Sequence, residues 1–175
     1  GVVMKRVLTI FLFLITGCAT MMVEPLTEEQ KEYQQILEIT GTQAELYASS
    51  KEWILTNLTG SHQVAMTRGL LDEGVLYDTG LLNSNDESFT LIANGYVEIV
   101  SFPVLNIKYN CKIQVKENRV RITYYDFNYF FDAGVDIRTW AELQPQMLNK
   151  LHPELDALNE DLKTKLSKNL NDSEW

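Results

Sequence analysis

The clearest pattern in the sequence runs from Leu105 to Lys116 and reads LNIKYNCKIQVK. Apolar residues take every odd position and polar residues every even one, which is typical of a strand with one buried face. After two turn residues, Glu117 and Asn118, the alternation resumes over residues 119–125, RVRITYY. The two segments predict a β-hairpin within an antiparallel sheet.

The two-residue turn also sets the register of this hairpin. It places Lys116 opposite Arg119 and Cys111 opposite Tyr124, so both strands agree on which face is buried. The opposite, solvent-exposed face carries a cluster of positive charges on an otherwise acidic chain. They belong to Lys108, Lys112, Lys116, Arg119 and Arg121. Such a patch fits an anionic partner, and an ordinary solvated sheet face explains it as well.

Six aromatic residues lie within the eight positions from Tyr124 to Phe131. Continued alternation would place half of them, including Tyr125 and Phe127, on the wet face beside the cations. Exposed aromatic side chains often mark recognition surfaces. The alternative is that C-terminal helices cover them. Tyr125 and Phe127 therefore join the five cations as a candidate interaction surface.

A helix is expected to lie against this sheet. A strand over Tyr33–Thr40 ends at Gly41, and the capping box Thr42-Gln43-Ala44-Glu45 then starts a helix. Its expected buried stripe consists of Ala44, Tyr47, Ala48, Ile54, Leu55 and Leu58, with Trp53 on the flank. Further extended segments are expected over 62–67, 74–82 and 89–102, the last broken by a turn at Asn94-Gly95.

Residues 139–170 predict two C-terminal helices. The capping box Thr139-Trp140-Ala141-Glu142 is expected to start one that continues to about Leu151, and Pro153 to restart another as a first-turn residue. The second helix has an apolar stripe made of Leu155, Leu158, Leu162, Leu166 and Leu170. This stripe would pack on its own domain or dock on a partner.

The N-terminal residues indicate an exported, lipid-anchored protein. Lys5 and Arg6 precede an apolar run from Val7 to Ile15, about half as long as the roughly 20 residues that a membrane-spanning helix needs. Residues 15–18, Ile-Thr-Gly-Cys, resemble a bacterial lipobox. We expect residues 1–17 to be a signal peptide cleaved between Gly17 and Cys18, with acyl chains such as palmitate on Cys18. Residues 18–32 would then be the anchor and tether, and residues 33–131 the α+β domain.

Charge narrows the classes of partner. The 175 residues carry a formal charge of −9, and loss of Lys5 and Arg6 with the signal peptide would leave 13 basic and 24 acidic residues, a charge of −11. A field of this sign repels phosphate backbones, so no nucleic-acid partner is expected. Cys111 would be the one cysteine without a lipid, which excludes an intramolecular disulfide and favours a buried thiol.

A family resemblance rests on the first helix and the segments around it. Leu46-Tyr47, then five residues, then Trp53-Ile54, followed by Asp72-Glu73-Gly74 before a strand meander, resemble bacterial envelope domains of unknown function that have a TBP-like fold. The likeness covers roughly residues 33–131. It implies a helix across a curved antiparallel sheet, and it supplies no activity, cofactor or catalytic residue.

The sequence contains no recognisable catalytic or cofactor motif. His62 and His152 show no metal-ligand spacing. We therefore expect no enzyme and no cofactor, but a lipoprotein of the outer membrane, facing the periplasm, that binds another envelope component. One alternative is a carrier or sensor of a small hydrophobic ligand in a pocket lined by Tyr124–Phe131. A weaker alternative is a hydrolase that uses Asp72 or His62, with Glu73 and Asp78 as further carboxylates.

Overall fold

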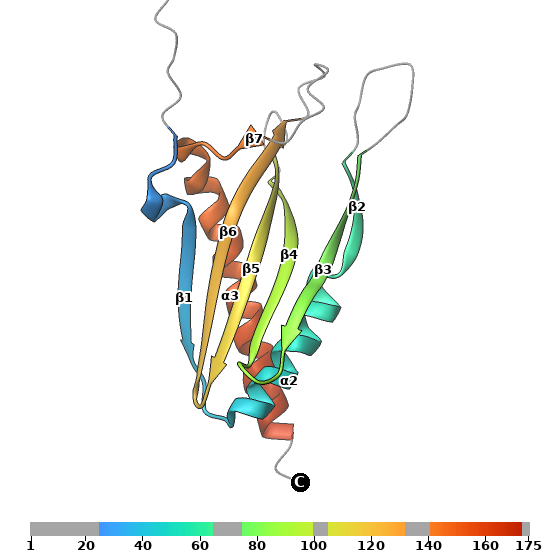
Figure 1. Ribbon diagram of the computed structural model, residues 1–175, viewed down its shortest axis with the longest axis vertical. Coiled ribbons are helices and arrows are strands. Elements are labelled where there is room, and N and C mark those ends of the chain that lie inside the picture. Colours follow the sequence, from blue (N-terminus) through green and yellow to red (C-terminus); the bar gives the residue numbers. More distant parts are fainter. Residues whose placement is uncertain (1–24, 65–74, 100–104, 132–140, 173–175) are drawn as a thin grey trace, which may run out of the picture.

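The computed structural model describes residues 25–64, 75–99, 105–131 and 141–172. The described elements follow one another as η1 (Glu28–Gln30), β1 (Glu32–Glu38), α2 (Gln43–Trp53), η2 (Ile54–Leu58), β2 (Gly60–Val64), β3 (Val75–Asn85), β4 (Thr90–Ile99), β5 (Leu105–Lys116), β6 (Arg119–Phe131), β7 (Ala141–Glu142) and α3 (Pro145–Asp172). The predicted α+β class is confirmed, as Figure 1 shows.

The strands form one antiparallel sheet in the order β1-β6-β5-β4-β3-β2, and β7 pairs with the end of β6. The predicted register of the central hairpin is confirmed: Lys116 pairs with Arg119 and Cys111 with Tyr124. Asn118, at a φ of +57°, forms the hairpin turn. Its amide donates to the Gly41 carbonyl over 3.0 Å and its side chain accepts from the Gly41 amide over 2.9 Å. The hairpin therefore positions the loop that leads from β1 into α2.

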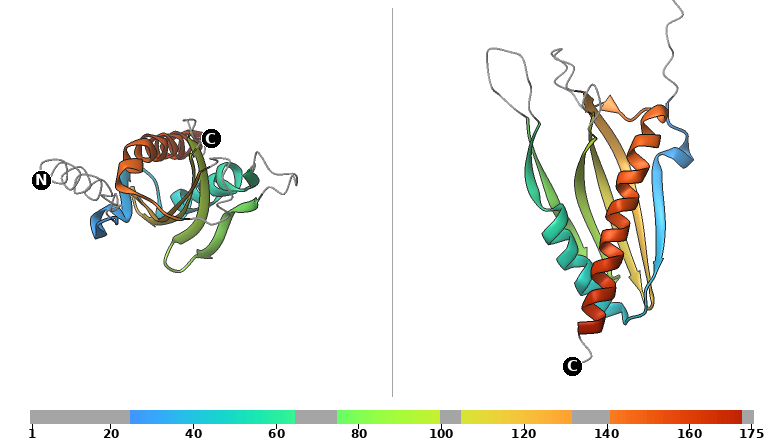
Figure 2. Two further views of the ribbon diagram at one scale, coloured as in Figure 1. Left: turned by 90° about the horizontal axis from the view of Figure 1, so that it is seen from above. Right: turned by 180° about the vertical axis from the view of Figure 1, so that it is seen from behind.

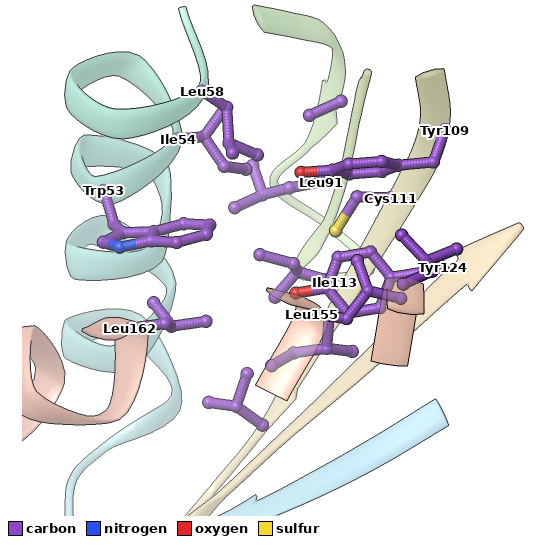
Figure 3. Packing of buried hydrophobic residues seen from close by; sticks show 14 of the residues in the cluster. Trp53, Ile54, Leu58, Leu91, Tyr109, Cys111, Ile113, Tyr124, Leu155 and Leu162 are labelled. Carbon is purple, nitrogen blue, oxygen red and sulfur yellow. The ribbon is translucent and has the colours of Figure 1, made fainter. Parts of the chain in front are cut away.

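Both helices cover the same face of the sheet, and the sheet curves around α3 (Figure 2). Between these layers lies the core, in which Trp53, Ile54 and Leu162 are fully buried against Ile113 and Tyr124 (Figure 3). The strand residues in the core are those whose alternation predicts a buried face, because successive side chains of a strand point to opposite sides. The other face of β5 and β6 stays uncovered by these helices.

The predicted capping box of α2 is confirmed, since the Thr42 hydroxyl accepts from the Glu45 amide over 3.3 Å. The predicted buried stripe is partly wrong. Leu55 is 53% exposed and Ala44 and Ala48 are also exposed, whereas Trp53 is fully buried rather than on the flank. The buried face of this helical segment is formed mainly by large side chains. They are Leu46, Trp53 and Ile54, with the small Ser50 between them, and they point to the sheet and α3.

The predicted turn at Asn94-Gly95 is wrong, because β4 runs through both residues. Gly95 is required by packing: a Cβ there would lie 2.3 Å from the Tyr109 ring, which crosses over it from β5. The Asn94 side chain accepts from the Gly80 amide over 2.8 Å and donates to the Asp78 carbonyl over 3.0 Å. Residues that favour a turn in isolation are therefore used here to join β3, β4 and β5.

The C-terminal segment differs from the two helices that the sequence predicts. Ala141 and Glu142 do not cap a helix but form β7, and Thr139 and Trp140 lie outside the described residues. A single helix, α3, begins at Pro145 and continues through Pro153. Because proline has no backbone N–H, the Asn149 carbonyl loses its helical hydrogen-bond donor at Pro153. Both residues are exposed, so water can donate to that carbonyl.

Candidate functional site

The candidate site is the outer face of the sheet, opposite the two helices. We use this name for the side chains of β1, β4, β5 and β6 that point away from α2 and α3. Register pairing places Ile36 beside Arg121, Arg121 beside Gln114, and Thr123 beside Lys112 on this face. All five cations of the candidate surface belong to β5 and β6: Lys108, Lys112, Lys116, Arg119 and Arg121.

The five cations differ in their partners. Arg119 forms an ion pair with Glu38 of β1, with 2.9 Å between Nη2 and Oε1. Lys108 also has an interaction with a neighbouring group. Within the described part of the chain, no acidic side chain forms an ion pair with Lys112, Lys116 or Arg121.

The predicted position of Phe127 is wrong. Phe127 is 3% exposed and belongs to the core, while Tyr125 is half-buried on the outer face. The register shifts between Lys108 and Asn110 of β5, and Asp126 on β6 has a φ of +57°. This bulge adds one residue to β6 and reverses which face the following side chains take. In the sequence, Asp126 is the one indication of this bulge, because Asp tolerates a positive φ better than most residues.

Two aromatic residues of the segment 124–131 contribute to the core and not to a surface. Tyr124 and Phe127 are both buried in the core cluster. A pocket of about 340 Å³ lies beside Phe127, and it is lined by Leu26, Lys31, Asp126, Phe127, Asn128 and Glu142. Because four of these six residues are charged or amide side chains, the pocket does not suit the hydrophobic ligand of the carrier hypothesis.

A row of polar contacts holds α3 to β1 and β6. The Tyr124 hydroxyl donates to Asn159 Oδ1 over 2.8 Å, and Asn159 Nδ2 donates to Gln35 of β1. One turn earlier, the Tyr33 hydroxyl donates to Asp156. Burial, together with this hydrogen bond, raises the pKa of Tyr33 to about 12. The sequence pattern shows the leucines of α3 and gives no sign of this row. Leu155, Leu162 and Leu166 are fully buried, so they are not available for the docking on a partner that the sequence left open.

Among the histidine and carboxylate candidates, His152 and Asp78 are the two whose side chains the structure describes. His152 stacks on the Tyr33 ring at 4.6 Å between centroids, and Asp78 is exposed. The backbone of His62 lies in β2, opposite Tyr77, while Asp72 and Glu73 lie outside the described residues. Among the described residues, no group of three or more His, Cys, Asp or Glu side chains is arranged to hold a metal ion.

Cys111 lies on the buried face of β5 as a free thiol. Burial raises its pKa to about 12. Because the thiolate is the reactive form of cysteine, this thiol is unreactive at neutral pH. Gly17 and Cys18, the predicted cleavage and lipidation site, lie outside the described residues. No helix in the described part of the chain is both long and apolar enough to span a bilayer.

Comparisons with known proteins concern the fold. No family model and no curated protein matches the chain. Among solved structures, it is similar to a TBP-like protein from Parabacteroides distasonis, with a TM-score of 0.57 and 16% identity over 81% of this chain and 96% of the other. It is also similar to a DUF4468 family protein from Bacteroides ovatus, with a TM-score of 0.52 and 12% identity over 85% and 91% of the two chains. Neither protein is described by a catalytic activity. The resemblance read from the helix motif is thereby confirmed at the level of architecture, and the chain has the TBP-like fold.

Proposed function

We propose that this protein is a lipid-anchored component of the bacterial outer membrane, facing the periplasm, and that it acts as a non-enzymatic binding module. The observation that carries the proposal is the asymmetry of the sheet. One face is buried under α2 and α3. Neither helix covers the other face, which holds five of the 13 basic residues that follow position 17. A concentrated cationic face on an acidic chain favours an anionic region of another envelope component.

The anchor is tested through Cys18. Metabolic labelling with an alkyne-bearing fatty acid should label the natural protein and leave the Cys18→Ser form unlabelled and released from the membrane fraction. More than one acyl chain is expected on Cys18, because a single chain gives only marginal membrane binding. Equal labelling of the natural protein and the Cys18→Ser form would refute the lipid anchor and would leave the proposed binding role untested by this experiment.

The binding face is tested by photo-crosslinking in intact cells. A photoreactive residue in place of Thr123 lies on the outer face, whereas one in place of Asn149 lies on the exposed side of α3. We expect crosslinked partners from position 123 and none, or far fewer, from position 149. A protein recovered alone from both positions would refute the proposed function.

A further inference from the structure

Three of the outer-face cations are evenly spaced along the strand direction. Arg121 lies opposite Gln114, and therefore diagonally from both Lys112 and Lys116. Diagonal neighbours on paired strands lie about 7–8 Å apart. Lys112 and Lys116 are four residues apart on one strand, or about 14 Å. The three groups, here called the cation row, thus present one positive charge about every 7 Å along the strand axis.

This spacing matches one kind of anion. In an extended polypeptide, alternate side chains point to the same side and repeat about every 7 Å. A segment with Asp or Glu at three alternate positions therefore brings one carboxylate to each member of the cation row. The residues between the cations can serve such a segment, since Gln114 and Thr123 offer hydrogen-bonding groups and Ile36, 42% exposed, offers apolar contact.

We infer that the outer face binds an extended acidic segment of a partner protein, with carboxylates at alternate positions on Lys112, Arg121 and Lys116. The inference rests on the proposed function, because it names the partner of the same face. No member of the cation row has an ion pair in the described part of the chain, so a ligand displaces water and not an internal carboxylate.

The position of the row also favours a protein over the anchoring membrane. Along β6, Arg119 begins the strand at the hairpin turn, and Tyr125 pairs with Glu32, close to where the described chain starts at Pro25. These two β6 positions are six residues, or about 20 Å, apart. Lys116 and Arg121 therefore lie near the β5–β6 turn, and Figure 1 shows this turn at the opposite end of the sheet from the start of β1.

The test uses the full-length protein in non-ionic detergent and two fluorescent peptides of equal composition. One has three glutamates alternating with threonines, and the other has three consecutive glutamates flanked by threonines. We expect the alternating peptide to bind at least about fivefold more tightly, because only it sets three carboxylates on one side. Equal affinities, or no binding of either peptide at about 1 mM, would overturn the inference.

Matched charge reversals identify the surface. The double variant Lys112→Glu, Arg121→Glu should weaken binding of the alternating peptide about tenfold or more. Each exposed ion pair contributes up to about a factor of five in affinity, and charge reversal adds repulsion. Lys150→Glu with Lys168→Glu makes the same change in net charge on exposed positions of α3 and should alter affinity less than about twofold. Equal weakening by both pairs would show a general field effect and overturn the inference.

Two further outcomes separate this inference from the proposed function. Binding to phosphatidylglycerol vesicles that depends on Lys112 and Arg121, without peptide binding, would assign the row to lipid headgroups instead. If crosslinks from position 123 persist in cells while both peptides fail to bind, the acidic segment is refuted and the binding face stands. If those crosslinks are absent, the proposed function falls as well.

Discussion

The contact between Tyr124 and Asn159 predicts a measurable coupling within the core. Both residues are buried, at 1% and 0% exposed, and the Tyr124 hydroxyl donates to Asn159 Oδ1 over 2.8 Å. Asn159 also donates to Gln35. Replacing Asn159 by Leu keeps the number and branching of the side-chain heavy atoms and leaves the Tyr124 hydroxyl without its acceptor. A buried polar group left unsatisfied costs about 1–3 kcal/mol.

The half-buried Gln35 can turn toward water, so most of the expected loss comes from Tyr124. We expect Asn159→Leu to lower the free energy of unfolding by about 2 kcal/mol and Tyr124→Phe by about 1–2 kcal/mol. In the double variant no hydroxyl is stranded. Its loss should therefore be smaller than the sum of the single losses by about 1 kcal/mol or more.

Urea unfolding followed by circular dichroism measures all four forms of this cycle, and the free energies follow from linear extrapolation. Glu154→Gln offers a comparison on an exposed residue of the same helix, and no coupling to Tyr124→Phe is expected there. Single losses that simply add, or an Asn159→Leu variant as stable as the natural protein, would refute the view that these polar contacts position α3.

Three further predictions concern packing, capping and the core thiol. Gly95→Ala should lower the free energy of unfolding by about 1–3 kcal/mol, because the new Cβ overlaps the Tyr109 ring; unchanged stability in urea would contradict this. Thr42→Ala should lower it by about 1 kcal/mol through loss of the α2 cap, whereas Thr56→Ala on the exposed side of η2 should have a smaller effect. In a Cys18→Ser form, Cys111 should resist a thiol reagent at pH 8 until urea unfolds the chain. Because folding raises its pKa from 9 to about 12, its contribution to stability is present below pH 9 and is lost as the pH rises toward 12, which alkaline unfolding would show.

Local patterns predict the parts of this fold in which each residue's environment depends on its near neighbours. The alternation of β5 and β6 and their two-residue turn are sufficient for the register, because a slip by one residue would expose the whole apolar set. The α2 capping box is equally local, since Thr42 and Glu45 satisfy each other's amides. The five cations could be placed on one face for the same reason.

Predictions fail where contacts come from distant parts of the chain. Asn94-Gly95 favours a turn in isolation, but Tyr109 of β5 occupies the space over Gly95 and Asn94 bonds to β3, so the strand continues. Pro153 ends many helices, but α3 continues through it, with Leu151 and Leu155 buried on either side.

The hairpin, the start of α2 and the charge of the outer face follow from the amino-acid sequence, because they depend on side-chain alternation and on residues a few positions apart. The fold was needed to show which cations form ion pairs, that Phe127 turns into the core, and that a polar row on α3 contacts two strands. Ion pairs, a bulge between paired strands and buried hydrogen bonds join residues up to 124 positions apart, as between Gln35 and Asn159. Contacts of this kind leave no periodic pattern in the sequence.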